Sequence, residues 1–381
     1  MTTDKPHICF VAPKIYPVLF GDKSIESVGG AEVQQAFIAR GLRDAGYRVS
    51  VASFDYGQED DAEIDGIRVY KIHRTARRIP IIRNVHPDMT SFWDAMLRAD
   101  ADIYYQRCAG AHTAVLAAFA RWHGRKFIYA GACDKDFIPH DRILLERWRD
   151  RWLFALGLRW ADAIVAQNPY QVEACRQWHR REANLIFNGY FPPLGGKASN
   201  DGVVLWVSVM RHMKRPDILL DLAERLPHIR FRMIGGRSTN GLENEYYDLI
   251  EARAQTLTNV EFIGFVPYAE VEKYYDDARL FVSTSEFEGF PNTFLQCWAR
   301  GVPTVSFVDC GARDDGRPLG AVVTNLDEMT AAVDQYWYDN AYWAKEGARA
   351  QGYFNLNHSP QVVIAKYCEL LDRVMAERRA G

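Results

Sequence analysis

The 381-residue sequence lacks the patterns that mark several protein classes. No apolar run approaches the about 18 to 20 residues that a membrane-spanning helix needs. The 7 cysteines are scattered, with neither a CxxC pair nor the Cys/His spacing of a zinc site, so we expect no disulfide framework. The start, MTTDKPHICFVAP, predicts a short strand rather than a signal peptide. A cytoplasmic location follows as the simplest expectation, with any membrane contact being peripheral.

Charge of either sign is not in large excess. The sequence has 46 Lys and Arg residues against 49 Asp and Glu, a net charge of −3, which argues against a nucleic-acid partner. One stretch departs from this balance, because residues 66–83 carry only basic charges, at Arg68, Lys71, Arg74, Arg77, Arg78 and Arg83. A solvated surface explains this stretch, and so does contact with an anionic acceptor or membrane surface.

The sequence does contain apolar runs of strand length that alternate with helical patterns, which is typical of parallel βαβ units. A first series of expected strands covers residues 7–11, 48–53, 68–72, 102–105, 126–129, 163–166 and 184–187. A second series covers residues 203–207, 230–234, 260–263, 280–283, 304–307 and 321–323. Because the length also favours two domains, we predict an α/β protein with two Rossmann-like domains.

A turn-rich stretch, NGYFPPLGG at 188–196, separates the two series and fits an interdomain linker. We place the first domain at 1–190 and the second at 191–358. We expect ligands to bind in a cleft where the strand ends of the two domains face each other. The last segment, 359–381, has apolar residues at helical spacing and is long enough to return to the first domain.

Two glycines near the front of the chain are typical of an anion site. Gly29 and Gly30 precede a helix that is expected to run to about Asp44. Glycines at a helix start let a ligand approach the backbone N–H groups closely. Paired glycines in such a turn are also common for purely geometric reasons.

Three cations lie between the strand at 203–207 and the helix that follows it. Arg211, Lys214 and Arg215 could together clamp a diphosphate, since lysine supplies a point charge and arginine a fork. The alternative is a basic turn in solvent.

The segment FVSTSEFEGFPNTFLQCWARGVPTVSF, residues 281–307, is the most informative. It predicts a buried strand, a turn that carries Glu288, a helix from Asn292 to about Arg300, and a second strand. Glu288 could accept hydrogen bonds from sugar hydroxyls, and the backbone N–H groups after it could bind a phosphate. Gln296, about two helical turns on, could reach a ribose or be an ordinary amide on the helix surface.

A helix expected over residues 141–163 combines Trp148 and Trp152 with several arginines. In one interpretation the helix packs in the core of the first domain with its arginines in solvent. In the other it rests on an anionic membrane that carries a lipid-linked acceptor.

These motifs together resemble the GT-B glycosyltransferases of family 4. The resemblance covers nearly the whole chain in the family's order, in the stretches VGGAEVQ, WVSVMRHMKRPDILLDLAERL, NVEFIGFVPYAEVEKYYDDARLFVSTSEF and EGFPNTFLQCWARGVPTVSF. It implies two Rossmann-like domains facing across a cleft, with the C-terminal helix crossing back to the N-terminal domain. The implied activity is transfer of a sugar from a nucleotide-diphosphate sugar to an acceptor hydroxyl, with retention at the anomeric carbon and without a metal or other cofactor.

The resemblance also implies partners and roles. The expected setting is a bacterial polysaccharide or lipopolysaccharide pathway, with a carbohydrate or lipid-linked saccharide as acceptor on the first domain and the nucleotide sugar on the second. Glu288 matches the first acid of the family's E-x7-E motif, which contacts the donor sugar. Lys214 matches the lysine that neutralises the diphosphate. The remaining matches are the backbone that receives phosphate and sugar (Gly289, Phe290, Pro291, Asn292 and Thr293), the front-domain turn beside the phosphate (Gly29 and Gly30) and a position near the base (Val266).

Three positions depart from the family pattern. Gln296 stands at the second acid of E-x7-E, so its bonds to a ribose would be neutral and weaker. Val209 replaces the usual arginine, which leaves Arg211 or Arg215 to supply the second cation.

The third departure is Cys133, which stands at the histidine of a His-Asp pair. His112 or Asp134 is therefore the candidate to face the sugar from the acceptor side. The departures leave two alternatives open: a sugar-nucleotide epimerase on the same plan, and a degenerate protein that only binds nucleotides or glycans.

Overall fold

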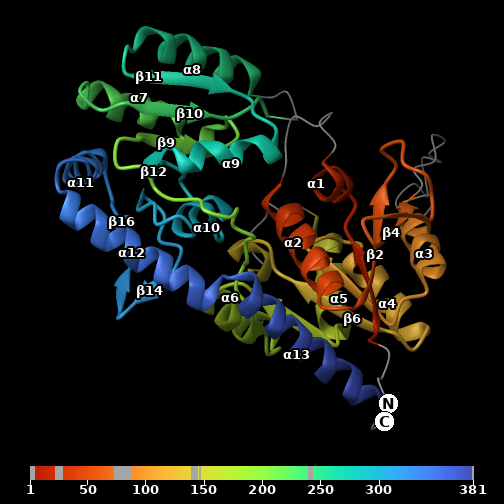
Figure 1. Cartoon of the computed structure of the whole chain (residues 1–381). Helices are drawn as coiled ribbons and strands as arrows, with labels where there is room; N and C mark the ends of the chain where they lie inside the picture. The colour runs from red at the N-terminus through yellow and green to blue at the C-terminus, as the bar shows by residue number, and fades with distance from the viewer. Residues whose placement is uncertain are drawn as a thin grey trace. The chain divides into compact units, whose positions relative to one another are not determined.

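The chain divides into two compact units, each with its own sheet and core (Figure 1). The structure, a computed structural model, describes residues 5–21, 29–72, 88–138, 145, 147–238 and 243–379. Unit 1 takes the first strand, residues 29–189 and the chain from Pro360 onward, whereas unit 2 takes Tyr190–Ser359. The division after Gly189 lies beside the boundary that we expected after residue 190. The donor and acceptor roles of the domains stay predictions.

Unit 1 is built on an 8-stranded sheet with the order β3-β4-β2-β1-β5-β6-β7-β8. The strands are β1 (His7–Val11), β2 (Arg48–Phe54), β3 (Ala62–Ile64), β4 (Ile67–Ile72), β5 (Ile103–Arg107), β6 (Lys126–Ala130), β7 (Ala163–Ala166) and β8 (Asn184–Leu185). Neighbours are parallel except β3 and β4. The helices are α1 (Tyr16–Phe20), α2 (Gly30–Asp44), α3 (Asp88–Ala99), α4 (Thr113–Trp122), α5 (Trp148–Trp160), α6 (Pro169–Ala174) and α13 (Pro360–Arg379), with a 3-10 turn η1 (Asp134–Phe137) and a π-helical turn η2 (Cys175–His179).

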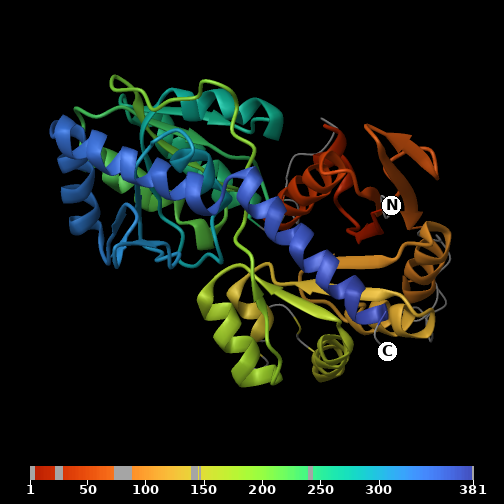
Figure 2. The ribbon, with the colours of Figure 1, turned by 60° about the horizontal axis from the view of Figure 1, so that its bottom comes forward.

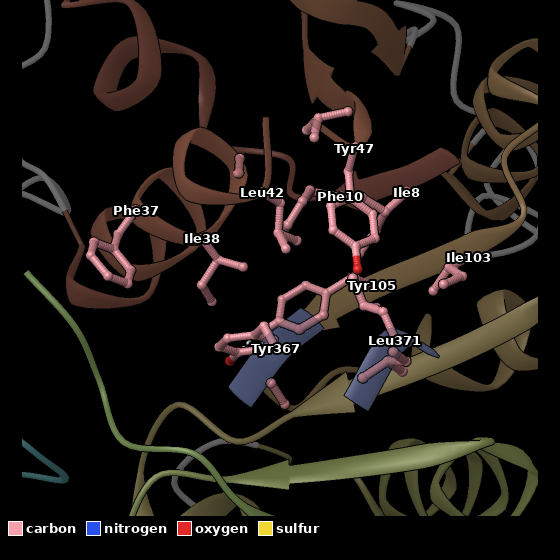
Figure 3. Packing of buried hydrophobic residues seen from close by; sticks show 14 of the residues in the cluster. Ile8, Phe10, Phe37, Ile38, Leu42, Tyr47, Ile103, Tyr105, Tyr367 and Leu371 are labelled. Atoms are coloured by element: carbon pink, nitrogen blue, oxygen red, sulfur yellow. Dashed lines mark hydrogen bonds between the residues drawn. The ribbon is translucent and has the colours of Figure 1, made fainter. Parts of the chain in front are cut away.

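Helices cover both faces of this sheet. Successive residues of a strand point to opposite faces, so alternate residues of β1 pack against different helices. Ile8 and Phe10 of β1 lie in one apolar cluster with residues of α2 and α13. Cys9 and Val11 lie in another, with residues of α3, α4 and α5. Figure 3 shows the first cluster, in which Phe10 and Tyr105 of the sheet lie near side chains of α2 and α13.

The C-terminal helix α13 packs into unit 1, which confirms the expected return of the chain. Its buried residues recur at helical spacing: Val363, Ile364, Tyr367, Leu370, Leu371 and Val374. The rings of Tyr367 and Tyr105 meet edge to face with centroids 6.2 Å apart. An added methyl on Gly41 of α2 would lie 2.3 Å from Ile364, so the two helices pack closely. Figure 2 shows α13, in blue, running along unit 1.

Unit 2 is built on a 6-stranded sheet with the order β11-β10-β9-β12-β13-β16, in which all neighbours are parallel. The strands are β9 (Val203–Val207), β10 (Phe231–Ile234), β11 (Val260–Gly264), β12 (Ala278–Ser283), β13 (Thr304–Ser306) and β16 (Ala321–Val322). The helices are α7 (Pro216–Arg225), α8 (Asn244–Thr256), α9 (Tyr268–Asp276), α10 (Asn292–Trp298), α11 (Leu326–Tyr338) and α12 (Asn340–Asn357), with a 3-10 turn η3 (His212–Lys214). A separate hairpin joins β14 (Arg313–Asp314) to β15 (Arg317–Pro318).

This second sheet is also covered on both faces. Val204 and Trp206 of β9 pack with residues of α7, α8 and α11, whereas Leu205 packs with residues of α9, α10 and α12. The strand order reverses between β9 and β12, since β10 and β11 lie on one side and β13 and β16 on the other. In sheets of this kind ligands bind outside the carboxyl ends of the strands at the reversal. The two parallel sheets, each covered by helices on both faces, confirm the predicted α/β fold with two Rossmann-like domains.

Some element predictions need correction. The short strands β3, β14 and β15 were not expected, and β8 is shorter than 184–187. Helix α10 ends at Trp298 rather than Arg300, because the chain turns at Gly301 with φ 74°. The basic stretch begins with Arg68 and Lys71, which pair with acids of the preceding segment. Its other arginines lie outside the described residues.

The prediction for 141–163 is partly wrong. Helix α5 buries Phe154, Gly157 and Leu158, and it leaves Trp148 and Trp152 exposed instead of placing them in the core. Residues 141–144 lie outside the described part of the chain. None of the described helices is both long and apolar enough to cross a membrane.

Candidate functional site

The loops that follow β9 and β12 meet at the strand-order reversal of unit 2. The two strands are parallel neighbours, so their carboxyl ends share one edge of the sheet. The first loop closes with η3, and Arg215, with φ 49°, leads into α7. The motifs around Lys214 and Glu288 are thus brought together by topology.

Hydrogen bonds join these two loops directly. The Thr284 hydroxyl donates to the Lys214 carbonyl at 2.7 Å and accepts from Trp206 Nε1 at 2.9 Å. The Glu286 N–H donates to the Met213 carbonyl at 2.9 Å. Thr284 and Trp206 are buried, so this chain of two hydrogen bonds holds the backbone of Lys214 in place.

The side chains of Lys214 and Glu288 form an ion pair, in which Nζ donates to Oε1. Ser285 Oγ donates to the same carboxylate oxygen at 2.8 Å. Ser285 is buried, whereas the side chains of Lys214 and Glu288 are 17 % and 22 % exposed. A ligand can therefore reach a cation and an acid that are held side by side, one suited to a phosphate and the other to sugar hydroxyls.

The two arginines that could supply a second cation lie toward different strands. Arg211 Nε donates to Ser238 Oγ at 3.2 Å and lies 3.7 Å from Glu243, in the segment after β10. The Arg215 guanidinium lies 4.8 Å from the ring centroid of Phe307, after β13. Since β10 and β13 flank the β9–β12 pair, the three cations spread along the sheet edge with Lys214 between the arginines.

The turn after Glu288 has its largest side chains in the interior. Phe290 and Pro291 are buried, and the Phe290 ring lies 5.1 Å from that of His358. Gly289, Asn292 and Thr293 are half-buried. Aromatic packing thus fixes the turn, and its predicted role in donor binding stays a prediction.

Gln296 is only 3 % exposed. Its Nε2 donates to Glu272 Oε1 at 3.0 Å, while Glu272 Oε2 accepts from Arg300 at 2.8 Å and from the Tyr190 hydroxyl. A glutamate at 296 would set two carboxylates at hydrogen-bond distance, which gives a physical reason for the amide here. Whether Gln296 also reaches a ribose stays a prediction.

Val266 follows β11 and is partly buried against the cluster that includes Phe294 and Trp298. These contacts do not test whether Val266 lies near the nucleotide base, so that position stays a prediction.

In unit 1, Gly29 caps α2 and Gly30 begins it. The φ of Gly29, −82°, is one that any residue adopts. What fills the space beside it is Glu32, whose Oε2 would lie 2.1 Å from an added methyl on Gly29. The Glu32 carboxylate bends back over the helix start, where an anion is favoured, so a phosphate would have to compete with it.

His112 lies between β5 and α4, where it contacts Phe92 and Gln106. Its ring stacks on that of Phe92 with centroids 5.0 Å apart, and Gln106 Nε2 lies 3.0 Å from its Nε2. Burial lowers the pKa of His112 to about 4, so the imidazole is neutral near pH 7.

Asp134 follows β6, the next strand in the sheet. Its Oδ1 accepts from Asn168 Nδ2 at 2.8 Å and from Gln171 Nε2 at 2.9 Å. The adjacent Cys133 donates from Sγ to Asp136, and burial raises the pKa of its thiol to about 12. Cys133 therefore supplies neither the imidazole nor a thiolate, and the acceptor roles of His112 and Asp134 stay predictions.

Sequence reasoning missed the residues that hold the end of unit 1 in place. The buried Arg107 donates from Nη2 to Gln167 Oε1 at 2.9 Å and to Asn188 Oδ1 at 2.8 Å. Gln34 of α2 donates to the Gly189 carbonyl at 2.9 Å and accepts from its N–H at 3.0 Å. Gln34 lies within VGGAEVQ, but its partner is 155 residues away, so no local signal reveals the contact.

Comparison with known proteins connects this geometry to a family. The family model described as "Glycosyl transferase 4-like domain" matches residues 29–190, and the model "Glycosyl transferases group 1" matches residues 193–320. The second match contains both Lys214 and Glu288. This chain belongs to the GT-B glycosyltransferases of family 4.

Named relatives of this glycosyltransferase are distant. Mannosylfructose-phosphate synthase of Agrobacterium fabrum is 24 % identical over 362 residues, which cover 80 % of this chain and 77 % of that protein. The O-antigen biosynthesis glycosyltransferase WbnH of Escherichia coli is 24 % identical over 154 residues, 40 % of this chain and 42 % of its own. The chain thus matches less than half the length of the O-antigen relative.

Solved glycosyltransferase structures share the fold. Sucrose-phosphate synthase of Thermosynechococcus elongatus matches with a TM-score of 0.77 and 15 % identity, over 98 % of this chain and 100 % of that one. The Anabaena protein HepE, solved in complex with UDP-glucose, matches with a TM-score of 0.72 and 19 % identity, over 97 % and 100 %. At these identities the likeness establishes the fold.

Proposed function

We propose that this glycosyltransferase moves a sugar from a nucleotide-diphosphate sugar to a hydroxyl of a carbohydrate or lipid-linked saccharide. The transfer retains the anomeric configuration, needs no metal ion, and serves the assembly of a bacterial polysaccharide or lipopolysaccharide. The observation that carries the proposal is the accessible Lys214–Glu288 pair at the strand-order reversal of unit 2. The UDP-glucose bound to HepE supports the donor class, and the O-antigen relative supports the setting.

Lys214 would exchange its bond to Glu288 for one to the donor diphosphate. A donor group aimed in advance at the leaving oxygen stabilises the charge that develops there, and removing one costs about 3 kcal/mol. Glu288, still held by Ser285, would then accept hydrogen bonds from the sugar and favour positive charge at the anomeric carbon. Because lysine already neutralises the phosphate, we propose that no divalent cation takes part.

The proposed reaction occurs on one face of the sugar. The bond from the anomeric carbon to the phosphate oxygen breaks as the acceptor oxygen bonds on the same side. The acceptor proton passes to the departing phosphate oxygen, so no separate strong base is needed. His112 fits a positioning role better than that of a base, since a group with a pKa of about 4 is weakly basic near pH 7.

Glu288→Ala tests this proposal most simply. A thermal-shift screen of UDP-, GDP-, ADP- and dTDP-sugars first finds the donor, because a ligand at about 100 times its Kd adds about 2.7 kcal/mol of stability. Nucleotide release is then followed with and without acceptor, and we expect Glu288→Ala to lower it about 100-fold or more. Glu286→Ala, at an exposed acid two residues away, is the control. A folded Glu288→Ala enzyme with wild-type turnover contradicts the site.

The same assay separates the alternatives. Free sugar without acceptor indicates an epimerase, and donor binding without turnover indicates a binding protein. Product anomers read by NMR test retention, and turnover that survives a chelator tests metal independence. Transfer to free hexose phosphates alone, rather than to saccharides, would contradict the polysaccharide setting.

A further inference from the structure

Helix α5 has a core-facing side and an outer side that carries aromatic residues. Phe154, Gly157 and Leu158 are buried at the spacing of a core-facing stripe. Trp148 and Trp152, one helical turn apart, are 75 % and 59 % exposed. Tryptophan is usually well buried, so two of them one turn apart on the outer face of one helix mark a local apolar patch that a partner could bind.

Tight packing sets the orientation of α5. An added methyl on Gly157 would lie 2.7 Å from the carbonyl carbon of Thr113 in α4, so the two backbones are in close contact. The Phe154 ring meets that of Tyr129 with centroids 5.2 Å apart. These contacts hold the buried stripe inward, which keeps Trp148 and Trp152 on the outside.

Basic residues surround the two tryptophans. Arg147 and Arg149 are exposed and Arg151 is half-buried, while Asp150 is the acid of this turn and accepts from Arg149 at 2.9 Å. Residues 147–152 thus carry three positive charges and one negative charge, a formal sum of 3 − 1 = +2. Exposed indoles among arginines suit the headgroup region of an anionic bilayer, where indoles are favoured and each cation adds attraction.

The first turns of α5 lie at the carboxyl end of the unit 1 sheet, which we call the acceptor edge because the acceptor is proposed to bind there. Helix α5 ends at Trp160, just before β7, and β7 is parallel to β6. The helix therefore runs against the strand direction, and its first turns lie at the carboxyl end of the sheet. Asp134 follows β6 at this same end. Trp122, at the last turn of α4, lies at the opposite end and is 82 % exposed.

We propose that Trp148, Trp152, Arg147 and Arg149 form a docking surface for an anionic lipid bilayer. Docking through this surface would bring the acceptor edge of unit 1 to the lipid that carries the acceptor. The inference rests on the proposed function for its lipid-linked acceptor, and on the contacts of unit 1 for the surface itself.

Flotation of the whole protein with vesicles tests this surface. We expect binding to vesicles of phosphatidylcholine with phosphatidylglycerol, none to phosphatidylcholine alone, and weaker binding as salt rises. Trp148→Ser with Trp152→Ser lowers the partition coefficient about tenfold or more. Arg147→Gln and Arg149→Gln lower it about fivefold each. Trp122→Ser, at an even more exposed tryptophan, leaves it unchanged.

Three results would overturn the proposal: no flotation at low salt, unchanged flotation of the double tryptophan variant, or an equal loss with Trp122→Ser. Lipid-free self-association that the double tryptophan variant abolishes would identify a protein interface instead. Nucleotide release with a soluble saccharide acceptor is measured on the same variants. If docking alone is wrong this release persists in the wild type, whereas if the proposed function is wrong it is absent.

Discussion

The two sheet edges of this glycosyltransferase are built differently on the same topology. Both sheets reverse strand order once, between β9 and β12 in unit 2 and between β1 and β5 in unit 1. At the unit 2 edge, Lys214 and Glu288 from the two loops pair with each other and stay partly exposed. At the unit 1 edge, His112 and Asp134 are engaged separately by neutral amides of their own surroundings.

This difference matches the chemistry proposed for each edge. Every nucleotide-diphosphate donor carries the same phosphates, so one fixed cation–acid pair serves all of them. Acceptors differ, and residues that are held separately, as His112 and Asp134 are, can be exchanged one at a time without changing the other. Substitutions at the unit 2 edge should therefore act on rate, and those at the unit 1 edge on stability and acceptor binding.

The largest effect is expected from Lys214→Ala. Loss of the cation removes charge stabilisation at the leaving diphosphate, so kcat/KM for the donor should fall about 100- to 1,000-fold. Arg225→Ala, which breaks an exposed ion pair with Asp327 in the same unit, should stay within about twofold. Nucleotide release at saturating acceptor gives both numbers. Equal turnover by Lys214→Ala and the wild type would mean that the phosphate is neutralised elsewhere.

The next effect, on stability, is expected where unit 1 ends. A methyl added at Gly189 would lie 2.2 Å from Cζ of Phe37 beneath the Gln34 contact, so Gly189→Ala should cost about 2 kcal/mol. Gly352→Ala is the matched control, since an added methyl on that helical glycine meets nothing within 4 Å and should be neutral or stabilising. Urea unfolding midpoints compare the two, and an equal loss in both would contradict the close packing at Gly189.

A smaller effect tests the amide beside the unit 2 site. Gln296→Glu places a second carboxylate against Glu272 and should destabilise the protein by about 1 kcal/mol. Glu272→Gln also removes the ion pair with Arg300, so the loss in the double variant with Gln296→Glu should be smaller than the sum of the two single losses. Unfolding midpoints of the two single variants and the double variant give the coupling. Additive losses would show that the two side chains do not interact.

The smallest effect is a pH dependence at His112. Burial lowers the pKa of its imidazole from 6.5 to about 4, so the unfolded chain takes up a proton that the folded protein does not. The stability from this group is complete above about pH 6.5 and is lost as the pH falls toward about 4. The urea midpoint of His112→Gln should therefore drop less between about pH 7 and about pH 5 than that of the wild type. Equal drops would mean that His112 titrates normally.

His7 adds to the same slope in both proteins. Burial also lowers its pKa to about 4, so part of the pH dependence should remain in the His112→Gln variant.

Most strands could be predicted because buried parallel strands are continuous apolar runs, as in Val203–Val207 and Ala163–Ala166. Strands β3, β14 and β15 could not, since strands of two or three residues carry no period. Lys214 and Glu288 were recognisable from their motifs. Glu272 was not, because its bond to Gln296 joins α9 to α10 across 24 residues.

A contact between residues far apart in the sequence also decides which side of α5 is buried, and for this reason Trp148 and Trp152 were wrongly expected in the core. The sequence of α5 has apolar residues around most of the helix, so spacing alone did not show which side is inside. The close approach of Gly157 to α4 decides the matter, and only the three-dimensional structure reveals that contact.

A crystal structure of the enzyme with the sugar nucleotide found by thermal shift would show directly which side chains bind the diphosphate and the sugar. We expect a phosphate oxygen about 3 Å from Lys214 Nζ and a sugar hydroxyl bonded to Glu288, with the Lys214–Glu288 pair opened. A sugar nucleotide bound away from the β9–β12 edge, with that pair intact, would contradict this expectation.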